Sequence, residues 1–139
     1  ALASARYDSG DGQKIRCGYG IFYRNPTSYF VYVGPDASDA SLDCSERNRN
    51  YNSGEDTIIS TKVFTESRVE FKLPFPDIFF EPPDPKTYIC RSRCLSDGQC
   101  RATCSGLDQP PQEITIGKIG GNCPQDCKTI NVYTSGKIQ

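Results

Sequence analysis

The sequence predicts a small, mainly β domain that disulfide bonds stabilise. Three observations support this: short segments in which apolar and polar residues alternate, turn-forming residues between those segments, and eight cysteines in 139 residues. No segment has the periodicity of an amphipathic helix of useful length. We therefore expect an antiparallel β-sandwich or barrel with at most one short helix, as a single domain over residues 13–139 after a flexible arm over residues 1–12.

The first half of the chain contains a predicted hairpin. Residues 15–21 alternate with period two, residues 29–33 are aromatic and β-branched, and the turn-forming residues 25–28 separate them. A short strand is expected over residues 40–44. Residues 45–54 are polar and rich in asparagine, and they predict a loop.

Two further strands are predicted near the middle of the chain. Residues 57–64 are rich in β-branched side chains, which favour strands. In residues 69–73, charged side chains alternate with Val69, Phe71 and Leu73. We expect all three of these apolar residues to face the core.

The most unusual local sequence is Pro74–Pro85, which contains five prolines. Because proline donates no backbone hydrogen bond, this segment is not expected to form a central strand or a helix interior. The rings of Phe75, Phe79 and Phe80 predict a pre-ordered apolar loop that binds a protein partner. The alternative is that the same rings fill the core from one side.

The second half of the chain continues the β pattern. Residues 87–90, 114–116 and 129–133 are its strand candidates. Between the first two, Ser96–Cys104 is expected to open a single helical turn that ends at Gly106.

The eight cysteines predict four disulfide bonds. Cysteine makes up several times its ordinary share of the chain, and there is no histidine to complete a zinc site. Three pairs have the spacing C-x3-C, which is not the usual knuckle spacing of zinc sites. The pairing stays open, because eight cysteines allow 105 connectivities. The cysteines are Cys17, Cys44, Cys90, Cys94, Cys100, Cys104, Cys123 and Cys127.

This cysteine content also predicts a secreted protein, because disulfide bonds form and persist in oxidising compartments. Ala1–Ala5 resembles the small-residue end of a cleaved signal peptide, or equally a remnant of an expression vector. No apolar run approaches the roughly 20 residues of a transmembrane helix. The expected location is extracellular.

Charge and composition exclude several classes of function. The chain carries 16 basic and 17 acidic residues, so its net charge of −1 provides no field to attract nucleic acid or anionic lipid. Without histidine, imidazole-based catalytic triads and acid–base pairs are excluded. The remaining acid–base candidates are carboxylates such as Glu55, Asp56, Glu66 and Glu70. No catalytic constellation is recognisable, and we expect neither enzymatic activity nor a cofactor.

The cysteine-rich region offers a second candidate binding surface. Arg91, Arg93 and Arg101 lie among the cysteines, where a cystine-rich lobe would present them to a protein partner. The alternative is that this lobe only attaches the last strands to the sheet. Nucleic-acid sites usually combine basic residues with aromatic residues between them, and this region has no such aromatic residues.

Two other ligand classes have candidate residues. An aromatic run could stack on sugar rings, although tyrosines in strands more often pack across the sheet. Two groups of aspartates carry the oxygen ligands that calcium prefers, but neither matches the twelve-residue calcium loop, so solvated turns without a metal are expected. The aromatic residues are Tyr19, Phe22, Tyr23, Tyr29, Phe30, Tyr32 and Tyr51, and the aspartates are Asp8, Asp11, Asp36, Asp39 and Asp43.

In general make-up, the chain resembles the small secreted cysteine-rich effectors of plant-pathogenic fungi: one small domain, an even cysteine set and no catalytic motif. Parts of it are similar instead to the surface-antigen β-sandwich domains of apicomplexan parasites. Those parts are Leu42–Cys44, the proline-rich stretch from Phe75 to Cys90, and Cys127–Tyr133. The chain departs from that family in the cysteine-free span between Cys44 and Cys90 and in the Cys94–Cys104 cluster, so no residue roles are transferred.

These observations predict a secreted, monomeric, non-enzymatic protein that binds a protein partner. The resemblance to effectors implies a virulence factor acting on a host protein, and the resemblance to parasite antigens implies a cell-surface antigen or adhesin. The same residues also leave open a small carbohydrate-binding protein and a self-associating coat component.

Overall fold

The computed structural model describes residues 7–8, 15–34, 49–53, 56–65, 68–81, 86–94, 96–106, 110–135 and 138–139. Within these ranges the chain forms eleven strands and no helix. The described segments accordingly include no helix that is long and apolar enough to cross a membrane. The predicted mainly β, antiparallel, disulfide-containing fold is confirmed.

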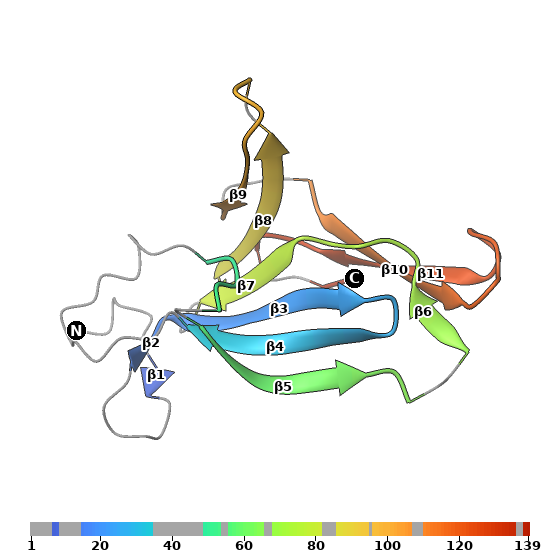
Figure 1. Ribbon diagram of the computed structural model, residues 1–139. Coiled ribbons are helices and arrows are strands. Elements are labelled where there is room, and N and C mark those ends of the chain that lie inside the picture. The colour runs from blue at the N-terminus through green and yellow to red at the C-terminus, as the bar shows by residue number, and fades with distance from the viewer. Residues whose placement is uncertain are drawn as a thin grey trace.

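A six-stranded antiparallel sheet is the larger layer of the molecule (Figure 1). Its strands run in the order β5-β4-β3-β7-β8-β9, so β5 and β9 are its edges. The bounds are β3 Gly18–Asn25, β4 Ser28–Gly34, β5 Thr57–Val63, β7 Asp77–Glu81, β8 Lys86–Cys94 and β9 Cys100–Ser105.

A three-stranded sheet in the order β11-β10-β6 packs against one face of the larger sheet. Its strands are β6 (Val69–Phe71), β10 (Gln112–Lys118) and β11 (Cys127–Val132). In addition β1 (Tyr7–Asp8) pairs with β2 (Ile15–Arg16), so two residues of the expected N-terminal arm are in a strand.

The predicted hairpin of the first half is confirmed as β3–β4. Its turn is held by the side chain of Asn25, whose Oδ1 accepts hydrogen bonds from the Thr27 amide at 2.9 Å and from the Ser28 hydroxyl at 2.9 Å. Asparagine suits this position because its side chain bonds to backbone two residues on. The loop predicted next is free of strands in its described part, residues 49–53, and the strand predicted over residues 40–44 lies outside the described residues.

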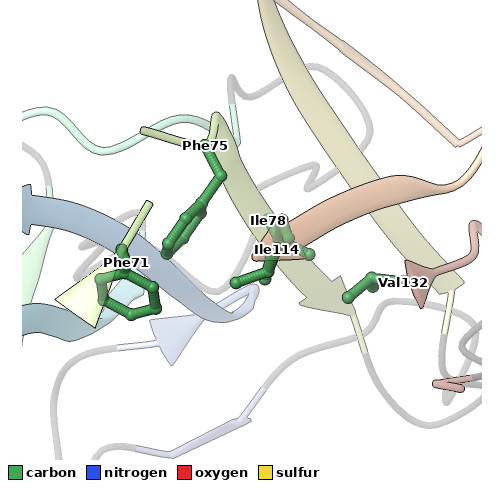
Figure 2. Close-up of a cluster of buried hydrophobic side chains, with 5 residues drawn as sticks. All are labelled: Phe71, Phe75, Ile78, Ile114 and Val132. Atoms are coloured by element: carbon green, nitrogen blue, oxygen red, sulfur yellow. The ribbon is translucent and has the colours of Figure 1, made fainter. Parts of the chain in front are cut away.

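The main core lies between the two sheets. Figure 2 shows Ile78 of β7 beside Ile114 of β10, together with Phe71, Phe75 and Val132. All five side chains are buried, and the aromatic rings of Tyr23 and Tyr29 from the β3–β4 hairpin pack against Phe71. Sheet packs on sheet here because each buries the apolar side chains of the other.

A second buried cluster lies on the opposite face of the larger sheet. Tyr32, Phe79 and Cys17 form it, with Tyr51 and Tyr88 packed against it. The ring of Tyr32 crosses directly over Gly20, where any side chain would collide with it. Glycine is therefore required at this position of β3 by a close approach.

The structure corrects the prediction for the proline-rich segment. β7 is a central strand, paired with β3 on one side and β8 on the other. It fits because Asp77–Glu81 contains no proline: Pro76 precedes it and Pro82 follows it, so all its backbone amides are available to the ladder. The short β6 also ends earlier than predicted, and Leu73, two residues beyond it, is 67% exposed and does not face the core.

The predicted helical turn is wrong as well. Cys100–Ser105 forms β9, which pairs with β8 in a hairpin that projects beyond the two layers (Figure 1). The turn of this hairpin contains Gly98 in the left-handed region, at φ 83°. The disulfide between Cys90 and Cys104 joins the two strands at directly opposed positions, which an extended backbone permits.

Candidate functional site

The structure packs the predicted phenylalanines into the core and does not expose them on a loop. Phe75 and Phe79 are 6% and 1% exposed, and Phe80 is half-buried against the main core. Phe79 and Phe80 point to opposite faces of β7, and both faces of this central strand are covered. Phe75 lies in the segment before β7, and its ring packs against Tyr23 and Phe71 in the main core. The exposed apolar loop expected at Phe75, Phe79 and Phe80 is therefore wrong.

The predicted arginines lie on the projecting hairpin. Arg93 of β8 is paired in register with Arg101 of β9, and the side chains of both lie outside the described part of the structure. Arg91, which lies closer to the core on β8, is half-buried and donates a hydrogen bond from Nη2 to the carbonyl oxygen of Pro110 at 3.0 Å. Of the three, Arg91 is the one that the structure places in a cleft.

The cysteines whose side chains the structure describes are all in disulfide bonds. Cys90 bonds Cys104 and Cys123 bonds Cys127, and Cys17 is disulfide-bonded too. Of the bonds whose two partners are described, one joins a C-x3-C pair and the other joins two such pairs across β8 and β9. No described cysteine is free.

The cleft lies where the N-terminal end of β7 meets β8, the start of β10 and the segment Arg49–Ser53. Its volume is about 550 Å³. Cys90, held in its disulfide, is part of the lining. The other lining residues are Phe22, Asn50, Tyr51, Pro74, Phe75, Pro76, Asp77, Arg91 and Gln112.

The segment Arg49–Ser53, which we call the strap, covers the second cluster and forms one wall of the cleft. The Arg49 guanidinium lies 3.8 Å from the centre of the Tyr88 ring and forms an ion pair with Glu81 at 3.2 Å. The Tyr32 hydroxyl donates to the carbonyl oxygen of Arg49 at 2.8 Å. Polar contacts therefore hold the strap, and they also fix Tyr51 over the cleft.

Asp77 is the acidic side chain in the lining of the cleft. Its Oδ2 accepts a hydrogen bond from the Tyr51 amide at 2.6 Å. Burial raises the pKa of Asp77 to about 6, although the hydrogen bond from Tyr51 acts in the opposite direction. Burial also raises the pKa of Tyr32 above its usual range, with the charges of Asp77 and Asp56 adding to the effect, so the Tyr32 hydroxyl stays protonated.

The other acidic candidates do not join this cleft. Asp56 accepts a hydrogen bond from the Asn52 amide at 2.7 Å and thereby connects the strap to the residue before β5. Glu70 forms an ion pair with Lys72 at 3.1 Å on the smaller sheet. Glu55 and Glu66 lie outside the described residues.

No metal centre is found within the described ranges, where no three metal-ligating side chains come together. The predicted aspartate groups stay predictions, since Asp11, Asp36, Asp39 and Asp43 and the side chain of Asp8 lie outside those ranges.

The aromatic run is divided between the clusters. Tyr23 and Tyr29 pack into the main core, and Tyr32 lies in the second cluster. Phe22 and Tyr51 line the cleft, with their ring centres 5.2 Å apart. Sequence reasoning named Phe22, Tyr51 and Arg91, but it missed Asp77, Asn50 and Gln112, because isolated polar residues beside prolines or in loops carry no signal of a shared site.

A second candidate surface is the edge strand β5. Within the described residues it pairs with β4 alone. Six of its seven residues are exposed, including Ile59 at 51% and Val63 at 59%. Lys62 is its one charged residue. Natural sheets shield edges with charges, prolines or bulges, and β5 carries Lys62 and a register irregularity at Ile59. Most of the strand is nevertheless exposed and partly apolar, which makes it a candidate strand-pairing surface.

Comparisons of this chain with protein-family models, with curated proteins and with solved structures each found no match. The function must therefore be argued from the geometry of the cleft and of the β5 edge.

Proposed function

We propose that the protein is a secreted, non-enzymatic binding protein that captures an extended segment of a partner protein along the edge of β5. Its role would be that of a pathogen effector acting on a host protein, or of a surface adhesin. The single observation that supports this proposal is the exposed apolar edge of β5. The disulfide bonds are compatible with an extracellular location.

The edge of β5 provides what strand addition requires. A strand at the end of a sheet leaves alternate backbone N–H and C=O groups unpaired on its outer side, and a partner strand satisfies them. The side chains of Ile58, Ile59 and Val63 supply apolar area on both faces of the added strand. Main-chain hydrogen bonds then give affinity, and these side chains give selectivity.

The chemistry of β5 also defines the partner. Threonine, isoleucine and valine favour a β-branched or aromatic segment opposite them. Lys62 favours an acidic residue at the opposed position, because opposite charges across a strand pair are stabilising. The expected partner segment is therefore extended, apolar in alternation, and acidic at one end.

The test is selection of a displayed library of twelve-residue peptides against the whole folded chain. Selected peptides should shift the amide NMR signals of Ile58–Val63. Ile59→Lys should weaken their binding at least tenfold, because the added charge opposes burial of that face. Ile119→Lys is the matched control, since Ile119 is 47% exposed in the turn after β10 of the smaller sheet, and it should bind as the parent does.

Two outcomes would overturn the proposal. Selected peptides that bind Ile59→Lys as tightly as the parent would show that β5 is not the contact. A dimer of the parent chain, measured by light scattering and dissolved by Ile59→Lys, would show that β5 pairs with a second copy of this chain and not with a foreign segment.

A further inference from the structure

The cleft at Asp77 is a second surface, and β4 lies between it and β5 in the sheet. Three properties define it. Its walls are aromatic, from Phe22, Tyr51 and Phe75. Its volume of about 550 Å³ lies within the range of small-ligand pockets, roughly 300–1,000 Å³. Its polar side chains have hydrogen-bonding atoms that the described structure leaves unused.

These unused atoms include both acceptors and donors. Asp77 uses Oδ2 for the Tyr51 amide, and no described residue donates to its Oδ1. Arg91 commits one guanidinium nitrogen to Pro110, and its other N–H groups have no described acceptor. The side-chain amide of Asn50 makes no hydrogen bond within the described ranges, and Gln112 uses only its NH₂ group, toward the carbonyl of Glu113.

We propose that this cleft binds a neutral sugar unit of an oligosaccharide. A sugar hydroxyl both donates and accepts, so adjacent hydroxyls match a carboxylate oxygen beside guanidinium and amide N–H groups. The C–H face of a pyranose ring is slightly positive and stacks on the negative face of an aromatic ring such as Tyr51. The Cys90–Cys104 disulfide and the prolines hold the lining in place before a ligand binds, which lowers the entropy cost of binding.

The charges of the cleft select for a neutral ligand. Asp77 and Arg91 carry opposite charges in the same lining, so neither an anion nor a cation gains a net attraction. A compact sugar ring fits the cleft better than an extended peptide, because the ends of β7 and β10 bound it. Burial of an ionised carboxylate with one unused oxygen is costly for a structural residue and is frequent in binding sites.

The test is an NMR titration of the whole folded chain with cellohexaose, xylohexaose, laminarihexaose, mannohexaose and chitohexaose, with hexagalacturonate as the charged comparison. At least one neutral sugar should give saturable shifts at the amides of Asn50, Tyr51, Asp77 and Gln112. The Tyr51 amide is the sharpest reporter, since it donates directly to Asp77.

Asp77→Asn tests the role of the carboxylate. Asparagine keeps an oxygen for the Tyr51 amide, so the fold is expected to persist, while sugar affinity should fall about tenfold through loss of a charge-assisted hydrogen bond. Asp126→Asn is the matched control: its Oδ2 accepts the Asn122 amide at 3.0 Å in an exposed turn, and its substitution should leave sugar affinity unchanged. Gln112→Ala is a second variant: it removes a side chain that lines the cleft and makes no hydrogen bond to the strap, and it should also weaken sugar binding.

The proposal is overturned if no neutral sugar gives saturable shifts, if hexagalacturonate alone does, or if the shifts lie outside the cleft. Equal affinity of Asp77→Asn, Gln112→Ala and the parent would also overturn it. Ile59→Lys should bind sugar as the parent does, so failure of the β5 proposal and failure of this one are distinguishable.

Discussion

The two faces of the six-stranded sheet are closed in different ways. One is covered by a second sheet and buries an apolar cluster around Ile78. The other is covered by the strap. The Arg49–Glu81 ion pair, a cation–π contact with Tyr88 and a hydrogen bond from Tyr32 hold the strap in place. A second sheet covers a whole face because it buries a large apolar area. A short segment buries little area, so polar contacts must hold it, and it leaves part of the face uncovered. The cleft lies at that uncovered part.

The largest expected effect is the difference in unfolding free energy between a substitution in the sheet-covered core and one at the surface. Ile78→Ala should lower the free energy of unfolding by about 2–5 kcal/mol, because it leaves a cavity between two rigid sheets. Ile59→Ala, at an exposed position, should change it by less than about 0.5 kcal/mol. Denaturant unfolding measures both, and equal losses for the two variants would contradict the placement of the core.

A smaller effect is expected on the strap-covered face. Tyr32→Phe removes the hydrogen bond to the Arg49 carbonyl and should cost about 1 kcal/mol. The loss should be local: native-state hydrogen exchange should become faster at the Tyr51 amide and stay unchanged at Ile114. Uniform acceleration at both amides would show instead that the two faces unfold as one unit.

The smallest expected effect is the contribution of Asp77 to the pH dependence of stability. The folded pKa of Asp77, about 6, lies above the unfolded value, so the folded state binds more protons between about pH 4 and pH 6. The stability that this carboxyl contributes is present below about pH 4 and is lost as the pH rises through 6. Asp77→Asn should therefore be more stable than the parent at pH 7.5, on the order of 1 kcal/mol after allowance for solvent screening of a half-buried group.

Thermal unfolding of the two proteins at pH 4 and pH 7.5 measures this difference. The higher stability of Asp77→Asn relative to the parent should be present at pH 7.5 and nearly absent at pH 4. A variant that is more stable and yet binds sugar less tightly would identify Asp77 as a residue kept for binding at a cost in stability. A destabilised variant at pH 7.5 would show that the ionised carboxylate supports the strap.

The strands are predictable where alternation and turn residues agree, as in the β3–β4 hairpin around Asn25. β7 is not, because the prolines of the whole segment argue against a central strand, while the five residues between Pro76 and Pro82 satisfy a central ladder. At β9 the cysteine spacing favours a helical turn because residues four apart share a face on a helix, but they also share a face on a strand. Only the register with β8 decides between these two structures.

The cleft is less predictable than the fold. Tyr51 and Phe22 belong to the aromatic run that the sequence suggests for sugar stacking, and Arg91 to the basic cluster. Nothing local in the sequence brings these together with Asp77, because the hydrogen bond from the Tyr51 amide joins two segments that are distant in sequence. Such a site depends on tertiary contacts, which spacing along the chain does not encode.

The position of β3 between β4 and β7 has a consequence for folding kinetics. Hairpins β3–β4, β7–β8 and β8–β9 each pair neighbours in the chain, whereas the junction of Tyr19 with Phe80 closes a long loop. The entropy of closing that loop opposes the pairing, so β3 should assemble on β7 after the hairpins have formed.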